Sequence, residues 1–90
     1  MKLKDGFVLE EVGGAYLAVA VGERADSFNG MVRLNETGAF LWKLLSEREL
    51  TRDELAEEVA KAYEGVTRDE VLPGIAAFEA KLRAAGIIED

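Results

Sequence analysis

Residues 31–45 constrain the fold more than any other stretch of this chain, because a strand pattern changes there into a helix pattern without an intervening loop. Val32 and Leu34 alternate with residues of the opposite face, as in a strand. Asn35 is a favourable N-cap, and Glu36 places negative charge at the positive end of the helix that follows. A strand that runs straight into a helix fixes the angle between a sheet and a helical layer, so the rest of the chain must pack around this corner.

Two more strands are predicted before this corner. Phe7 to Val12 has the composition of a strand, and Gly13 and Gly14 supply the positive φ angles that a two-residue hairpin loop requires. Ala15 to Val21 is the next strand, and the polar segment from Gly22 to Gly30 is expected to be a loop. The heavier face of the second strand, which we expect to point into the core, consists of Leu17, Val19 and Val21.

Three helices are expected after the corner. The first runs from Glu36 to Ser46, and Trp42 in its apolar stripe is expected to anchor the core. Thr51 and Thr67 each precede a helical pattern and are followed three residues later by glutamate, which is the spacing of a capping box.

The last helical pattern contains Pro73 and Gly74. Proline inside a helix removes a hydrogen-bond donor, so we expect either a kink or a helix that begins near Pro73. Gly86 is expected to end this helix, and the apolar pair Ile87–Ile88 to fold back on the core.

Composition excludes several classes of function. Cysteine and histidine are both absent, which removes disulfides, thiolate zinc sites and Ser-His or Cys-His catalysis. We therefore expect no enzymatic activity and no cofactor. The net charge of −7 repels a phosphate backbone, so nucleic acid is not an expected partner. No apolar run approaches the roughly 20 residues that span a bilayer, which favours a cytoplasmic protein with no membrane partner.

A winged helix-turn-helix, whose usual ligand is DNA, also combines strands with three helices. A helix that reads DNA presents basic side chains to it. The second predicted helix is instead mostly acidic, with Asp53, Glu54, Glu57 and Glu58 against Arg52 and Lys61. A DNA-binding regulator is therefore the alternative function, and a scaffold for an unrelated protein is a third.

The third strand has an unpaired edge if the strands pair in chain order. Three alternatives are open for this edge. The terminal Ile87–Ile88 or a loop covers it, or Arg33 only protects it against aggregation. The third alternative is that an extended peptide adds to the edge as another strand. The edge can also pair with its own copy, so a homodimer through the strand edge is a further alternative.

The run Val32 to Leu45 reads V-R-L-N-E-T-G-A-F-L-W-K-L-L, and together with Thr51–Leu55 and the closing Leu82–Ile88 it resembles the PqqD-like family. The most specific part is L-N-E-T-G-x-x-x-W-x-L-L, and the resemblance covers nearly the whole chain. It implies an α+β, winged helix-turn-helix-like fold, in which a three-stranded antiparallel meander is followed by three helices, as one domain over residues 1–90.

The resemblance also implies a function. Domains of this family are recognition elements for ribosomally made, post-translationally modified peptides. They bind the leader of a precursor peptide as an added strand between the third strand and the third helix, and present it to a modifying enzyme, often a radical SAM protein. The peptide-binding residues that the resemblance implies here are Met31, Val32, Arg33, Leu34, Leu72, Ile75, Ala76, Glu79 and Arg83. For Leu72 and Ile75 simple core packing is the alternative, whereas Arg33 and Glu79 would select the charge pattern of a leader.

Overall fold

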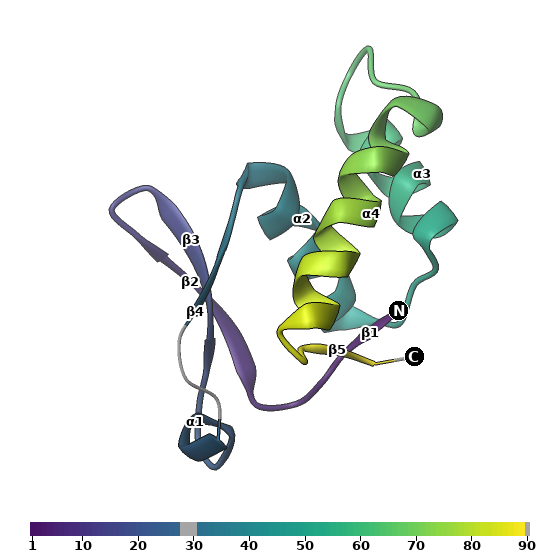
Figure 1. The fold of residues 1–90 in the computed structure, drawn as a ribbon. Helices are drawn as coiled ribbons and strands as arrows, with labels where there is room; N and C mark the ends of the chain where they lie inside the picture. The colour runs from purple at the N-terminus through teal and green to yellow at the C-terminus, as the bar shows by residue number, and fades with distance from the viewer. Residues whose placement is uncertain (28–30, 90) are drawn as a thin grey trace.

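The computed structural model describes residues 1–27 and 31–89, and it confirms the predicted α+β order of strands followed by helices. The main helices α2, α3 and α4 lie together on one side of the sheet (Figure 1). The elements are β1 (Lys2–Leu3), β2 (Phe7–Val12), β3 (Ala15–Ala20), α1 (Arg24–Ser27), β4 (Met31–Leu34), α2 (Glu36–Glu47), α3 (Arg52–Ala62), α4 (Arg68–Ala84) and β5 (Ile88–Glu89). No helix among these residues is long and apolar enough to cross a membrane.

Strands β2, β3 and β4 form an antiparallel sheet in that order, so the predicted meander is confirmed. Gly13 and Gly14 have φ angles of 57° and 83°, which only glycine adopts without strain, and they close the hairpin between β2 and β3 as expected.

The prediction that Leu17, Val19 and Val21 point into the core is wrong. Ala18 on the opposite face of β3 is 0% exposed, whereas Val21 is 40% exposed. Tyr16, which shares the face of Ala18, packs against the core and pairs in register with Leu34 of β4. Leu34 must enter the core because it leads directly into α2, and this register turns the alanine face of β3 toward the helices. The small alanines allow the helical layer to approach closely.

The predicted corner between strand and helix is confirmed. β4 ends at Leu34 and α2 begins at Glu36, and the side chain of Asn35 accepts a hydrogen bond of 2.7 Å from the backbone N–H of Gly38. A Cβ atom at Gly38 would lie 3.2 Å from the Cβ of Leu34, so the turn is tight as well as capped. The corner therefore positions β4 rigidly beside the helices.

Both predicted capping boxes are present. Thr51 and Glu54 cap α3, and Thr67 and Glu70 cap α4. Because α4 begins at Arg68 and continues through Pro73, the interpretation in which it begins near Pro73 is wrong. The capping box starts the helix upstream, and the missing N–H of proline leaves one carbonyl of the first turn without a helical donor.

The segment predicted as a loop from Gly22 to Gly30 contains a short helix, α1, while positions 28–30 lie outside the described residues. Its first residue, Arg24, places its guanidinium 5.4 Å from the ring centroid of Phe7 and donates a hydrogen bond to the carbonyl oxygen of Asp5. These contacts attach α1 to the end of the sheet. The polar composition of the segment did not predict them.

The core lies between the sheet and the helices. Trp42 is 3% exposed, which confirms it as an anchor. Ile87 and Ile88 are buried, so the tail folds back as predicted, and β5 pairs with β1 in a separate two-stranded sheet. The tail is thereby bound to the N-terminus, away from β4.

Candidate functional site

The candidate site begins at the edge of β4. In the sheet order β2-β3-β4, no strand among the described residues pairs with the second side of β4. The two-residue β5, which was one candidate to cover this edge, pairs instead with β1. The edge residues Met31–Leu34 thus offer main-chain groups on the side where the helices approach.

One side chain contacts this edge. The Nζ of Lys81 on α4 donates a hydrogen bond of 2.5 Å to the carbonyl oxygen of Arg33. The carbonyl of Arg33 therefore faces away from β3, and in an antiparallel pair the N–H of the same residue points the same way. By the alternation of such pairs, Met31 and Arg33 direct their main-chain groups outward, and Val32 and Leu34 direct theirs toward β3.

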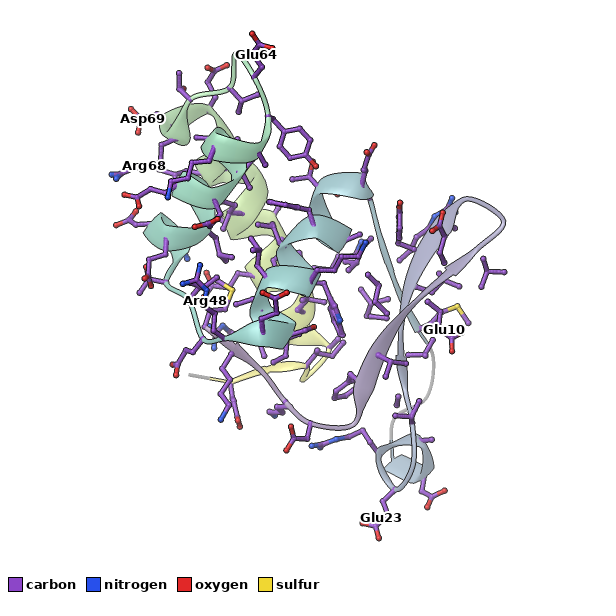
Figure 2. The ribbon with its side chains drawn as sticks, turned by 180° about the vertical axis from the view of Figure 1, so that it is seen from behind. Glu10, Glu23, Arg48, Glu64, Arg68 and Asp69 are labelled. Atoms are coloured by element: carbon purple, nitrogen blue, oxygen red, sulfur yellow. The ribbon has the colours of Figure 1, made fainter. Side chains whose placement is uncertain are left out.

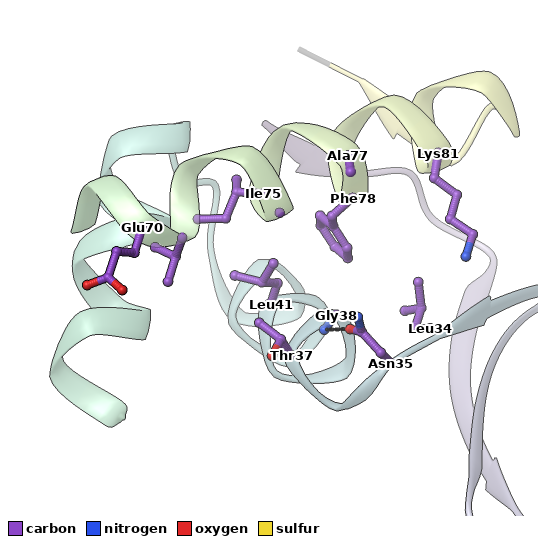
Figure 3. A pocket seen from close by; sticks show the side chains of 12 residues that line it. Leu34, Asn35, Thr37, Gly38, Leu41, Glu70, Ile75, Ala77, Phe78 and Lys81 are labelled. Carbon is purple, nitrogen blue, oxygen red and sulfur yellow. Dashed lines mark hydrogen bonds between the residues drawn. The ribbon is translucent and has the colours of Figure 1, made fainter. Parts of the chain in front are cut away.

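A groove of about 400 Å³ lies beside the end of this strand, between the first turn of α2 and one face of α4. Its wall is mostly apolar. Glu70 lies near one end of the groove and Lys81 at the other, where it points toward β4 (Figure 3). The side chains of the wall come from Leu34, Asn35, Thr37, Leu41, Glu70, Val71, Ile75, Ala77, Phe78 and Lys81, with Gly38 and Gly74 contributing backbone.

The groove has a charge asymmetry. The carboxylate of Glu70 accepts hydrogen bonds from the N–H and hydroxyl groups of Thr67, and so serves the cap of α4. Lys81 is the cationic residue of the lining. A ligand in the groove would therefore meet an apolar wall with a positive charge next to the strand edge.

The structure brings only part of the predicted site to this groove. Leu34 and Ile75 line it and are also buried in the core. Val32 is half-buried against the core, whereas the side chains of Met31 and Arg33 point to the face of the sheet opposite the helices. The α4 residues that do not line the groove are Leu72, Ala76, Glu79 and Arg83.

Glu79 lies on the side of α4 toward α3. Its carboxylate accepts hydrogen bonds of 2.7 Å from the guanidinium of Arg52 on α3 and 2.7 Å from that of Arg83 on α4. These bonds, the one from Arg52 first, hold the pKa of Glu79 below its ordinary value. The side chain of Glu79 is 15% exposed, and its ion pair with Arg52 links α3 to α4. Glu79 therefore does not face the groove.

Replacing Glu79 with glutamine is expected to lower the free energy of unfolding by about 1 kcal/mol at pH 7. Because the folded pKa is depressed, the carboxylate stabilises the fold above its unfolded pKa, and this contribution is lost as the pH falls through the folded pKa. Urea melts from pH 7 to pH 3 should show the two proteins converging. Glu57→Gln, at a carboxylate that is 54% exposed, is the control and should have a smaller effect. An equal loss of unfolding free energy in the two variants would contradict the conclusion that the ion pair of Glu79 stabilises the contact between α3 and α4.

The groove residues that sequence reasoning missed include Gly74, Ala77 and Lys81. They follow Glu70 and Val71 at helical spacing, so they lie on one face of α4. A Cβ atom at Gly74 would meet nothing within 4 Å, so the space beside this glycine is open. The signal in the sequence was the stripe formed by the small residues Gly74 and Ala77 and by Lys81, which lies beside the core stripe of α4.

The described residues contain no cluster of histidine, cysteine or acidic side chains that could hold a metal ion. They also contain no buried side-chain nitrogen or oxygen atom without a hydrogen-bond partner. Besides main-chain groups and apolar surface, the groove presents the ammonium group of Lys81, the carboxylate of Glu70 and the polar side chains of Asn35 and Thr37.

Comparison with known proteins identifies the fold and the family of the chain. No curated protein matches the chain. A solved structure described as TbiB1 in complex with the TbiA(beta) leader peptide has the same fold, with a TM-score of 0.73 and 20% sequence identity, over 99% of this chain and 95% of that one. Residues 8–88 match the model of the family described as coenzyme PQQ synthesis protein D (PqqD). With the match extending from the first strand of the sheet to the closing strand, the chain belongs to the PqqD family.

Proposed function

We propose that residues 1–90 act as one non-catalytic recognition domain, which binds the leader segment of a ribosomally synthesised precursor peptide as an added strand on β4. The domain then presents the precursor to a modifying enzyme, for which a radical SAM protein is our candidate. The observation that carries the proposal is the unpaired edge of β4 beside an apolar groove, with the chain's own tail bound elsewhere.

The energetics favour a peptide that uses both the edge and the groove. Each main-chain hydrogen bond contributes a net of about 0.5–1.5 kcal/mol, and Met31 and Arg33 offer only a few such bonds. A micromolar complex requires about 8 kcal/mol. Burying an apolar side chain adds about 1.5–3 kcal/mol, so we expect the leader to place large apolar residues against Val71 and Phe78.

The comparisons support the same ligand. The structural neighbour TbiB1 was solved with a leader peptide, and the present chain shares its fold. Binding by strand addition uses an exposed edge together with a surface that receives side chains, and the unpaired edge of β4 and the groove beside it support this mode. The groove presents no histidine, cysteine or serine side chain.

The proposal is tested with fluorescein-labelled synthetic peptides that tile the short reading frames adjacent to the gene. At least one peptide is expected to bind with micromolar affinity in fluorescence anisotropy. Arg33→Pro removes an outward N–H and should weaken this binding at least about tenfold, which corresponds to about 1.4 kcal/mol. Val32 is unsuitable for the same test, because its N–H lies on the β3 side and proline there would disrupt the sheet.

Arg33→Ala is the matched control, since it removes the same side chain and keeps the N–H. It should stay within about threefold of the original affinity. Arg33→Pro with full affinity, in a protein whose far-ultraviolet circular dichroism is unchanged, would contradict strand addition at β4. A duplex DNA fragment, which would bind with steep salt dependence if the domain read DNA, should not compete.

A further inference from the structure

The face of the sheet turned away from the helices is apolar and uncovered. Register places Val8, Leu17, Val19 and Met31 on this outer face, and Val12 and Val21 continue its rows. Met31 is 60% exposed and Val12 57%, and all large apolar residues that are exposed among the described residues lie on this face. A sheet face of this kind is unusual on a monomer, because antiparallel sheets normally present polar residues to water.

Two opposite charges flank the centre of this face at the same level. Glu10 on β2 and Arg33 on β4 both pair in register with Leu17 of the central strand. Figure 2 shows Glu10 on the side of the sheet that is turned away from the helices. Neither side chain forms an ion pair within the part of the chain that the structure describes.

We propose that this outer face binds a second copy of the chain, sheet against sheet. A two-fold axis parallel to β3 and midway between the sheets places the β2 of each copy over β4 of the other. Glu10 then lies opposite the partner's Arg33, and Leu17 lies over the partner's Leu17. The same operation places Val8 over the partner's Met31, so the apolar rows match as well. A two-fold axis in the same plane but perpendicular to the strands would instead place Glu10 over the partner's Glu10.

The geometry of packed sheets allows this arrangement. Aligned sheets pack about 10 Å apart, a distance that a glutamate and an arginine span together. The packing uses the face of the sheet and leaves the edge of β4 open, so the inference is independent of the proposed peptide binding.

The size of the face sets the expected affinity. Strands β2 and β3 have six residues each and β4 has four, so the sheet covers a flat area of roughly 260 Å². Stable interfaces bury about 800 Å² of accessible surface per partner, so this contact is well below that size. We therefore expect a dimer that dissociates on dilution, with a dissociation constant in the micromolar range.

Sedimentation velocity from about 5 to 500 μM provides the test. The unsubstituted protein should change from mostly monomer to mostly dimer over this concentration range. Glu10→Arg and Arg33→Glu each place like charges across the interface and should raise the dimer dissociation constant at least about tenfold. The double variant Glu10→Arg/Arg33→Glu restores opposite charges and should regain dimerisation. Leu17→Lys introduces a charge at the two-fold axis and should remain monomeric throughout.

Three results would overturn the inference. One is an original protein that is still monomeric at 500 μM. The second is a dimer whose dissociation constant is unchanged by Leu17→Lys and by the single reversals, which would point to pairing through a strand edge. The third is a double variant that fails to regain dimerisation while circular dichroism shows the folded spectrum. The peptide assay is read separately and does not depend on any of these results.

Discussion

Trp42→Ala is expected to lower the free energy of unfolding by about 3–5 kcal/mol. Trp42 lies on α2, is 3% exposed and belongs to the core cluster between the sheet and the helices. Its removal leaves a cavity that the surrounding side chains fill only in part. Since domains of this size are stable by about 5–15 kcal/mol, such a loss removes a large share of the total.

Urea denaturation followed by circular dichroism at 222 nm measures the effect, because Trp42 is the one tryptophan of the chain and its fluorescence is lost in the variant. Lys43→Ala, at an exposed neighbouring position on the same helix, is the control and should change stability by less than about 0.5 kcal/mol. A loss below about 1 kcal/mol for Trp42→Ala would mean that this side chain does not anchor the core.

Gly74→Trp is expected to lower the affinity for the leader peptide by about 100-fold, equivalent to about 2.7 kcal/mol. The space beside Gly74 is open within 4 Å, and it forms part of the groove between α2 and α4. An indole side chain at this position occupies the volume that the apolar side chains of the leader would use. Stability should not fall, because tryptophan is a better helix former than glycine.

The matched control is Ala80→Trp, which adds the same ring to an exposed position of α4 that does not line the groove. Anisotropy with the leader peptide identified by tiling should show unchanged affinity for Ala80→Trp. If Gly74→Trp also bound with full affinity, the groove would not be the place where the side chains of the leader are held.

Local signals predicted most of the fold. The corner at Asn35 and the capping boxes at Thr51 and Thr67 are short-range arrangements, in which one side chain bonds a backbone group three residues away. The hairpin at Gly13 likewise depends on backbone angles that few residues adopt. Because these signals act within a few residues, the sequence shows them without knowledge of the tertiary structure.

Long-range choices were harder to predict. Both faces of β3 are apolar, so hydrophobicity alone did not identify which one meets the helices, and the correct choice depends on the pairing of Tyr16 with Leu34. The strand pair β1 and β5 joins opposite ends of the chain, and two residues are too few to show a period.

The sequence predicted the strand and the helix that flank the candidate site, but not every residue that lines the groove. The position of β4 at the edge follows from the chain order of the meander. The face of α4 that reaches the groove depends on the rotation of the helix about its own axis, and this rotation is set by packing against α3. Glu79 bonds Arg52 of α3, and so Lys81 is directed to β4.

The bond from Lys81 to Arg33 has a consequence for solubility. An exposed strand edge invites pairing with other molecules, and many proteins prevent this with a lysine or a proline within the strand itself. Here the protecting ammonium group comes from a neighbouring helix, on a long and rotatable side chain. Protection of this kind is reversible, because the lysine side chain can rotate away from the strand and expose the backbone, whereas a proline within the strand would block the edge permanently.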